Sequence, residues 1–405
     1  MISVEDALRR VLGSVDAPVE AETVPLEAAA GRTLAADLRA LRTQPPFPAS
    51  AMDGYAVRSP DVASVPAVLR VVGRSIAGQR FDGSVAPGEA VRIFTGAPVP
   101  EGADAVVIQE NAKADGDAVL VRESVASGRF VRPTGLDFTE GACLLRAGER
   151  LDARRLALAA AMGHGRLSVR RRPRVALLAT GDELVRPGEP AGPDQIVASN
   201  LVALAALTAR AGAEPIDLGI ARDRFDDLQR GIETAREAGA DLLVTLGGAS
   251  VGEHDLVQSA LAKQGMTLGF WRVALRPGKP LVHGRLGRTL ILGLPGNPVS
   301  SIVCGLLFLL PAIRALQGDP FADRDASEPA RLGADLPPND ARQDYLRAAL
   351  EARPGELPTV TAHPLQDSSM LSVLARSDTL IVRAPLAPAV RAGDLVRVLR
   401  LDRLL

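Results

Sequence analysis

Residues 288–318, RTLILGLPGNPVSSIVCGLLFLLPAIRALQG, carry the pattern that decides the fold class. An apolar run passes through Pro-Gly-Asn-Pro into a second, longer apolar stretch. The first run is typical of a buried strand, and proline suits the first turn of the helix that follows Pro298. Free N–H groups and the positive end of the helix dipole favour an anion near Gly296, Asn297 and Ser300. A capped turn with nothing bound is the alternative.

The same alternation of strand and helix is expected towards the N-terminus, as far as about residue 173. RVALLATGDEL, EPIDLGIARD and ADLLVTLGGAS are typical of strands, and each is followed by a segment with helical periodicity. This alternation predicts a parallel sheet with covering helices over residues 173–320. In such sheets, ligands bind beyond the carboxyl ends of the strands.

Short strands between Gly and Pro turns flank this region on both sides. They predict a mostly β subdomain over residues 45–140 and a small C-terminal β domain over residues 328–405. A Ser-capped helix is expected over Ser3–Val15, and residues 152–165 are typical of a helix that ends in Gly. The predicted fold class is α/β plus β, in several domains.

The bulk composition excludes some classes of function. The chain has 405 residues and a net charge of -1, so charge does not indicate nucleic-acid binding. Cys143 and Cys304 are far apart and the four histidines are scattered, which argues against a His/Cys metal site. The N-terminus lacks the apolar core of a signal peptide, and the apolar segment SIVCGLLFLLPAI, about 13 residues, is too short to span a bilayer. We expect a cytoplasmic protein without membrane contact.

Acidic residues follow several predicted strands. Glu183 lies in LATGDELV, Asp223 in GIARDRFDD and Asp255 in GGASVGEHD. Mg²⁺ takes few carboxylates and keeps several waters, so these three acids are candidate ligands. Acids in a first helical turn are also ordinary partners of the helix dipole, which is the competing interpretation.

The loop after ADLLVTL supports two different functions. Gly248-Ala249-Ser250-Val251-Gly252 fits the nucleophile elbow of a serine hydrolase, with His283 or His363 as the base. The same loop is also a Gly-rich turn whose N–H groups, from Gly247 onwards, can bind an anion. Against the hydrolase, His283 lies in the strand-like segment PLVHGRL, and no HGGG-type segment is present.

Two further turns carry candidate side chains. RPGKP places the cations Arg276 and Lys279 just before the last strand of the α/β region. SAMDGYAV and RIFTGAPV place Asp53 and Thr95 next to glycines in the N-terminal β subdomain. Taken alone, each of these turns is explained by ordinary turn chemistry.

The segments SAMDGYAV, RIFTGAPVPEGADAVV, GLDFTEGACLLRAGERL, TGDEL, GGASVGEHD, RPGKP and GLPGNPVSS occur in one order. This set resembles the molybdopterin molybdenumtransferase family, which includes bacterial MoeA and the gephyrin E domain. The resemblance implies elongated homodimers with four subdomains, one of them discontinuous and here expected over residues 1–44 and 141–172. It also implies insertion of molybdate into adenylylated molybdopterin with release of AMP and a need for Mg²⁺.

The resemblance also implies an active site between the α/β domain and the partner chain's β subdomain and C-terminal barrel. The further partners it implies are a molybdopterin adenylyltransferase and recipient molybdoenzymes. A non-catalytic, gephyrin-like scaffold remains an alternative. The sequence does not distinguish molybdate from tungstate as the working oxyanion.

The family's site residues carry over by position. The catalytic positions implied are Asp53, Thr95, Asp137, Glu183, Asp223 and Asp255. The cofactor-binding positions implied are Gly247, Gly248, Ser250, Arg276, Lys279, Gly296, Asn297, Pro298, Ser300, Arg347 and Ser368. The chain departs from the usual pattern at Leu246, Ala249 and Arg276.

Overall fold

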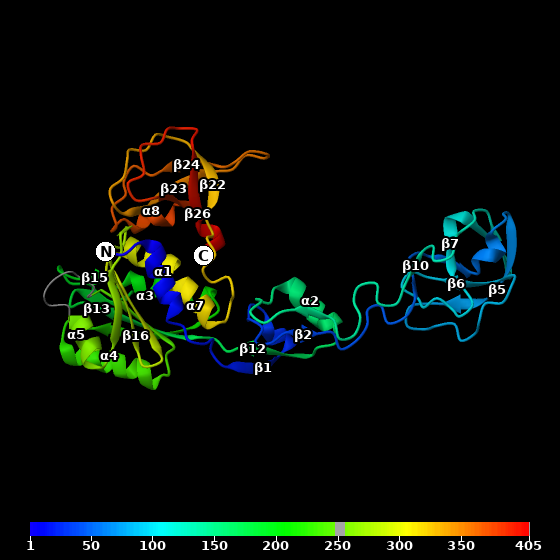
Figure 1. Ribbon diagram of the computed structural model, residues 1–405, viewed down its shortest axis with the longest axis horizontal. Helices are drawn as coiled ribbons and strands as arrows, with labels where there is room; N and C mark the ends of the chain where they lie inside the picture. Colours follow the sequence, from blue (N-terminus) through cyan, green and yellow to red (C-terminus); the bar gives the residue numbers. More distant parts are fainter. Residues whose placement is uncertain (248–255, 405) are drawn as a thin grey trace.

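The structure is a computed structural model that describes residues 1–247 and 256–404. The molecule is elongated, with an α/β region and a β barrel at one end and a mostly β region at the other (Figure 1). A narrow middle region joins the two ends. The predicted fold class is confirmed.

The α/β region is built on a six-stranded sheet. Its strands, in spatial order, are β16 (Glu214–Ala221), β13 (Arg174–Thr180), β17 (Leu242–Leu246), β21 (Thr289–Leu294), β20 (Pro280–Leu286) and β18 (Thr267–Arg272). The first four are parallel, but β20 and β18 are antiparallel to their neighbours. The expected wholly parallel sheet is therefore corrected to a mixed one. The reason is local, because β20 and β21 are joined by a two-residue turn that leaves no room for a crossover helix.

Helices cover both faces of this sheet, and each face has its own apolar core. One face packs against α1 (Val4–Gly13), α3 (Ser199–Arg210), α6 (Pro298–Cys304) and α7 (Leu310–Leu316). The other packs against α4 (Phe225–Glu237) and α5 (Leu256–Lys263). The side chain of Ser3 caps α1 by accepting from the N–H of Asp6 at 3.0 Å, as its sequence predicts.

The long apolar segment after Pro298 is a core helix. It runs without a break over Pro298–Leu316, through a π turn at Gly305–Leu309, so its 19 residues exceed the apolar segment of about 13 that was expected to be too short to span a bilayer. Among the described residues it is the one helix long and apolar enough to cross a membrane. In the fold, 72% of it is buried, so packing between the sheet, α1 and α3 accounts for its composition.

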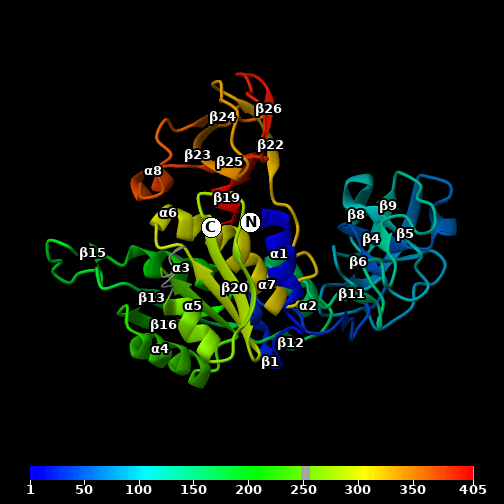
Figure 2. The same cartoon turned by 60° about the vertical axis from the view of Figure 1, so that its left-hand side comes forward.

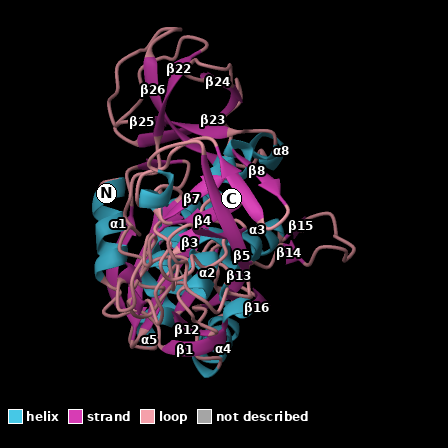
Figure 3. Ribbon diagram, turned by 90° about the vertical axis from the view of Figure 1, so that its right-hand side faces the viewer, coloured by secondary structure: helices cyan, strands magenta, loops and turns pink. Residues whose placement is uncertain are grey.

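The C-terminal region is a closed barrel of five strands, which Figure 3 shows above the α/β region. The five strands are β22 (Glu328–Leu332), β23 (Gln343–Glu351), β24 (Thr359–Ala362), β25 (Thr379–Arg383) and β26 (Leu395–Arg400). A sixth strand, β19 (Leu275–Arg276), comes from the α/β region and pairs with β23. Two short helices, α8 (Leu371–Ala375) and α9 (Leu401–Leu404), complete this part.

The N-terminal β region holds a second six-stranded sheet. In spatial order its strands are β7 (Ala105–Ile108), β4 (Gly54–Val57), β6 (Glu89–Ile93), β5 (Ala67–Ser75), β9 (Ala118–Val121) and β8 (Ala112–Asp115). Small pieces around it are β3 (Ala49–Ser50), β10 (Val131–Arg132) and the 3-10 turns Ser59–Val62 and Gln109–Asn111. It has apolar cores of its own, separate from those of the α/β region.

The middle region is made of two stretches of chain that run in opposite directions. Its elements are β1 (Ala21–Pro25), the 3-10 turn Leu26–Ala29, β2 (Leu38–Arg39), β11 (Cys143–Leu145), α2 (Ala153–Ala161) and β12 (Arg166–Arg170). Strand β1 pairs with β12, and β2 pairs with β11.

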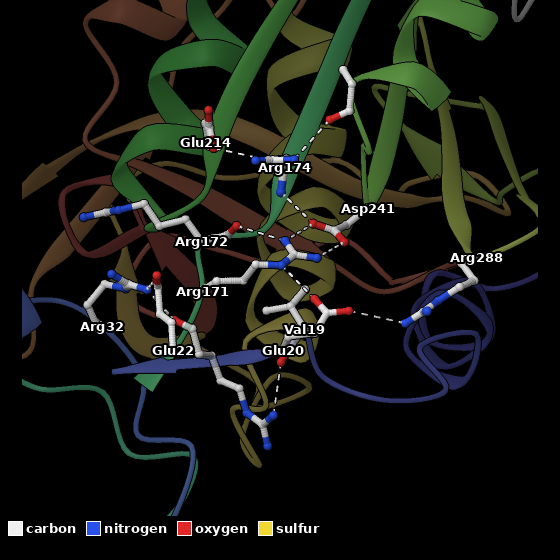
Figure 4. A network of polar contacts seen from close by, with 12 residues as sticks. Val19, Glu20, Glu22, Arg32, Arg171, Arg172, Arg174, Glu214, Asp241 and Arg288 are labelled. Atoms are coloured by element: carbon white, nitrogen blue, oxygen red, sulfur yellow. Dashed lines mark hydrogen bonds and ion pairs between the residues drawn. The ribbon is translucent and has the colours of Figure 1, made fainter. Parts of the chain in front are cut away.

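A charged network joins the middle region to the sheet (Figure 4). The guanidinium of Arg171 donates to both carboxylate oxygens of Asp241, at 2.7 and 2.8 Å, and to Glu20 at 2.7 Å. Asp241 also accepts from the N–H of Arg174, at the first residue of β13. The two chain segments that leave the α/β region are thereby tied to the amino end of its sheet.

Candidate functional site

A cavity of about 750 Å³ opens at the carboxyl ends of β13, β17 and β21. This is the place where ligands bind in open α/β sheets. Its walls come from the Gly-containing turns after these strands, the starts of α3, α5 and α6, and the ribbon of β14 (Leu184–Val185) and β15 (Ile196–Val197). Figure 2 shows that ribbon extending outward from the α/β region. Of the predicted site residues, the cavity is lined by Glu183, Asp223, Gly247, Gly296, Asn297, Pro298 and Ser300.

The Pro-Gly-Asn-Pro turn begins α6, with Asn297 as its N-cap and Pro298 as its first helical residue. The side chain of Asn297 makes no capping bond to the helix and instead donates to Ser368 Oγ at 2.8 Å. The carbonyl of Ser368 accepts from the N–H of Val299 at 3.1 Å. A loop of the barrel therefore lies against this helix start and satisfies one of its free N–H groups.

Two polar residues that sequence reasoning missed also shape the cavity. Asn200, at the start of α3, donates to the carbonyl of Gly296 at 2.7 Å and lies 3.3 Å from Ser301 Oγ. Thr180 ends β13, and a Cβ at Gly247 would lie 2.6 Å from its carbonyl oxygen. Gly247 also has a φ of +97°, so this close approach needs a glycine. No sequence signal singles out Asn200, because asparagine is common at helix starts.

Acidic residues gather at one side of the cavity. Glu183 and Asp223 line it, and Asp182 Oδ1 accepts from the N–H of Asp223 at 3.3 Å. Partial burial, then the negative charges of Asp182 and Glu183, raise the pKa of Asp223 above its ordinary value. Within residues 1–247 and 256–404, no three acids, histidines or cysteines are grouped closely enough to hold a metal ion. Asp255 lies outside the described residues, so the predicted three-acid set stays a prediction.

The RPGKP turn lies beside the cavity, which Pro280 helps to line. Its two cations, Lys279 and Arg276, have different surroundings. Lys279 is exposed, but Arg276 donates to Asp344 Oδ2 at 2.7 Å and lies 3.6 Å from Asp340. The structure thus places Arg276 against the barrel and not among the residues that line the cavity.

Arg347 was expected to bind cofactor, but its side chain is only 1% exposed. Its Nε donates to Gln366 Oε1 at 3.1 Å and its Nη1 to the carbonyl of Asp367 at 2.6 Å. These bonds hold the loop that carries Ser368. Arg347 therefore acts on the cavity through that loop.

Three predicted catalytic residues lie in the other half of the molecule. Asp53 and Thr95 belong to the N-terminal β region, which Figure 1 shows at the opposite end of the molecule from the α/β region, and Asp137 lies between β10 and β11. Asp53 Oδ1 accepts from the N–H and the hydroxyl of Thr95, both at 2.8 Å. Asp137 is exposed, and its N–H donates to the carbonyl of Gln44. A single chain does not bring these residues to the cavity.

The serine hydrolase needs Ser250 with His283 or His363 as its base, and the structure argues against His283 alone, since the described residues give His363 Nε2 no hydrogen-bond partner. Gly248 and Ser250 lie outside the described residues. His283 is 3% exposed, and its two ring nitrogens are occupied by Ser14 Oγ at 3.0 Å and the carbonyl of Ile291 at 3.1 Å. Burial lowers its pKa. His283 is accordingly a core histidine with no nitrogen free to act as a base.

Comparison with known proteins covers the chain from end to end. Family models match residues 2–163 as the MoeA N-terminal region (domain I and II), residues 176–315 as a probable molybdopterin binding domain, and residues 329–401 as the MoeA C-terminal region (domain IV). The molybdopterin molybdenumtransferase of Nostoc sp. is 37% identical over 99% of this chain and 94% of its own length. The chain belongs to the molybdopterin molybdenumtransferase (MoeA) family.

Other members of the MoeA family agree with this assignment. The molybdopterin molybdenumtransferase of Haemophilus influenzae is 33% identical over the full length of both chains. The crystal structure of the MoeA protein from Pyrococcus horikoshii superimposes with a TM-score of 0.84, at 30% identity, over 99% of each chain. Sequence and fold therefore match MoeA family members throughout, and the resemblance expected from the sequence is confirmed.

Proposed function

We propose that this protein inserts molybdate into adenylylated molybdopterin, releases AMP and needs Mg²⁺ to do so. It is a transferase of molybdenum cofactor biosynthesis, as its relatives' names and its family membership indicate. The finer proposal is supported by one observation above all: acids and a helix start face the same cavity. That arrangement suits a substrate that carries phosphate and a cation that accompanies it.

The charges around the cavity explain why a cation is needed. Both substrates are anions, so the carboxylates of Glu183 and Asp223 alone would repel them. Partial burial, and after it the negative charges of Asp182 and Glu183, raise the pKa of Asp223, and a bound cation would offset both effects. These oxygens fit Mg²⁺, which is satisfied by few carboxylates. Bound Mg²⁺ supplies neutralisation of phosphate charge and polarisation of the phosphoanhydride bond.

The chain's own residues bind and orient the substrate. The start of α6 and the backbone of the Gly247 turn offer N–H donors to phosphate oxygens. Lys279, exposed on the adjacent turn, adds a positive charge. Metal insertion itself uses the sulfurs of the pterin, so the protein's task is to place two anions next to each other.

The protein acts as a homodimer in this proposal. Within one chain, Asp53 and Thr95 lie at the far end from the cavity, so they reach it only as residues of a second copy. The proposal also includes a cytoplasmic location, without membrane or nucleic-acid contact. An adenylyltransferase would deliver the substrate, and molybdoenzymes would receive the product.

The direct test measures AMP release from adenylylated molybdopterin by the purified protein with molybdate, with and without Mg²⁺. We expect release by the wild type in Mg²⁺ only, and none by Asp53→Ala. Asp115→Ala is the matched control, since Asp115 is an exposed aspartate of the same β region. Tight binding without AMP release by the wild type would support a scaffold and refute the transferase reaction.

A mixing experiment tests the shared site. Asp53→Ala and Glu183→Ala chains are each inactive, but a mixed dimer has one site free of both substitutions. Random mixing of equal amounts should restore roughly a quarter of wild-type activity, because half the dimers are mixed and each has one intact site. No recovery, with subunit exchange demonstrated, would refute a site built across subunits.

A further inference from the structure

One strand of the barrel contacts both turns that flank the cavity. The RPGKP turn, residues 276–280, and the PGNP turn, residues 295–298, belong to the α/β region. Strand β23 reaches the first through Asp344 and the second through Arg347 and the loop that Arg347 holds. The barrel is thus in a position to set how far apart the two turns lie.

The contact with the RPGKP turn has a backbone part and a side-chain part. Strand β19 pairs in parallel with β23, with Arg276 opposite Asp344, and the N–H of Gln343 donates to the carbonyl of Ala274 at 2.9 Å. The guanidinium of Arg276 donates to Asp344 Oδ2 at 2.7 Å. The first residue of the turn is therefore held in the barrel sheet.

The ion pair joins a buried acid to a half-exposed base. Asp344 is 2% exposed, whereas about half of the Arg276 side chain faces solvent. Arg383 is near enough to attract Asp344, but Asp344 Oδ1 makes no hydrogen bond to any residue that the structure describes. Removing Arg276 would leave a buried carboxylate without its hydrogen-bonded cation, which is costly. Arg276 is consequently not free to turn toward a ligand.

The contact with the PGNP turn comes from the same strand. Arg347, three residues after Asp344, binds the loop at Gln366 and Asp367. The next residue, Ser368, bonds to Asn297 and Val299 at the start of α6. One strand therefore carries the contacts to both turns, three residues apart.

We propose that Asp344 is a positioning residue, which through Arg276 holds the RPGKP turn so that Lys279 alone grips the substrate's phosphate. The inference rests on the proposed function and deepens it. It assigns Arg276 a structural task in place of the cofactor-binding role expected from its sequence position.

The first test compares KM and kcat for adenylylated molybdopterin. Asp344→Asn keeps the shape of the side chain and removes its charge, and we expect KM to rise roughly 10- to 100-fold with kcat little changed. Asp340→Asn is the matched control, since its carboxylate is 3.6 Å from the same guanidinium but half exposed, and it should change KM less than about threefold.

The second test asks whether Arg276 acts through Asp344. We expect Arg276→Ala to raise KM in the wild-type background but to add nothing in the Asp344→Asn background. Equal factors in both backgrounds would show that Arg276 contacts the substrate itself and would overturn the inference. If Asp344→Asn fails to fold, Arg276→Lys serves instead; it should raise KM by a smaller factor, because lysine lacks the planar fork.

A third measurement needs no substrate. Amide hydrogen exchange of residues 274–276 and of Gln343 should speed up in Asp344→Asn and stay unchanged in Lys279→Ala. Unchanged exchange together with unchanged KM in Asp344→Asn would refute the inference while the wild type remains active. An inactive wild type would instead refute the proposed function, so the two failures are distinguishable.

Discussion

The carboxylate of Asp53 accepts two hydrogen bonds from Thr95, one from its N–H and one from its hydroxyl, both at 2.8 Å. The backbone bond, then the side-chain bond and the charge of Arg92, lower the pKa of Asp53 below its ordinary 3.8. A depressed pKa stabilises the fold above the ordinary value, and that contribution is lost only as the pH falls through the folded-state pKa. Asp53 is therefore a fixed carboxylate acceptor at every physiological pH.

Thr95→Val removes the hydroxyl bond and keeps the backbone bond. We expect the pKa of Asp53 to rise towards its ordinary value, because one of the two main causes of the shift is lost. Carbon-13 NMR of the carboxyl group against pH measures this. Thr95→Ser, which keeps the hydroxyl, should leave the pKa in place. If valine leaves it unchanged as well, the hydroxyl is not what holds the carboxylate.

Asp223 presents the opposite case, since partial burial and its acidic neighbours raise its pKa. Ionisation of a group with a raised pKa costs folding stability as the pH rises through that pKa. Asp223→Asn should therefore raise the thermal midpoint at pH 7 and leave it unchanged well below pH 3.8, measured in Mg²⁺-free buffer. A lower midpoint at pH 7 would contradict the crowding of charge.

The affinity for Mg²⁺ should also depend on Asp223. We expect Asp223→Asn to weaken Mg²⁺ binding at pH 7 by more than about tenfold in isothermal titration calorimetry. In the wild type, affinity should fall as the pH drops into the range of the raised pKa, because protons compete with the cation. Asp226→Asn, one of two acids in the first turn of α4, is the control. Equal affinities in wild type and Asp223→Asn would place the cation elsewhere.

Asn200, on α3, donates a hydrogen bond that holds the Pro-Gly-Asn-Pro turn. In Asn200→Ala, the carbonyl of Gly296 loses its side-chain donor, so the free energy of unfolding should fall by about 1–2 kcal/mol in urea denaturation. Affinity for adenylylated molybdopterin should fall roughly fivefold, because the helix start is less well held. Asn200→Asp, which cannot donate, should behave like alanine. Full affinity in both variants would show that substrate binding does not need the hydrogen bond from Asn200 to Gly296.

Gly278 in the RPGKP turn is constrained in two ways. Its φ is +119°, and an added Cβ would lie 2.5 Å from Cys304 Sγ. Gly265→Ala is a matched control, with a φ of +90° and nothing within 4 Å of the added atom. Both should lose about 1–3 kcal/mol of stability from backbone strain, and Gly278→Ala about 1–3 kcal/mol more from the collision. Equal losses in thermal denaturation would mean that the turn moves away from Cys304 without cost.

Predictions from the sequence were confirmed for features that depend only on residues close together along the chain. The Ser3 cap, the strand that ends at Leu294 and the helix that starts at Pro298 were all predicted and are observed. The prediction was wrong where an element's surroundings matter. The sheet was expected to be parallel, but β20 runs antiparallel to both of its neighbours, because a tight turn, not a helix, connects it to β21.

The positions of some candidate site residues could likewise be predicted from the sequence, whereas the contacts of others could not. The turn after a parallel strand puts Glu183, Gly247 and Asn297 at one edge of the sheet, so their meeting in one cavity follows from alternation alone. The partner of Arg276 does not follow, because Asp344 is 68 positions away and belongs to another part of the fold. The same holds for Ser368 and Asn297, which are 71 positions apart.

By itself, the sequence determined the α/β architecture, the anion-favouring turns and the family. These depend on periodicity, on proline and glycine chemistry and on the order of short motifs. Only the tertiary structure decided that Arg276 pairs with a buried acid, that Arg347 holds a loop, and that Asp53 lies at the far end from the cavity. The physical reason is that a charged side chain takes the partner that packing brings near it, and packing joins residues that the chain keeps far apart.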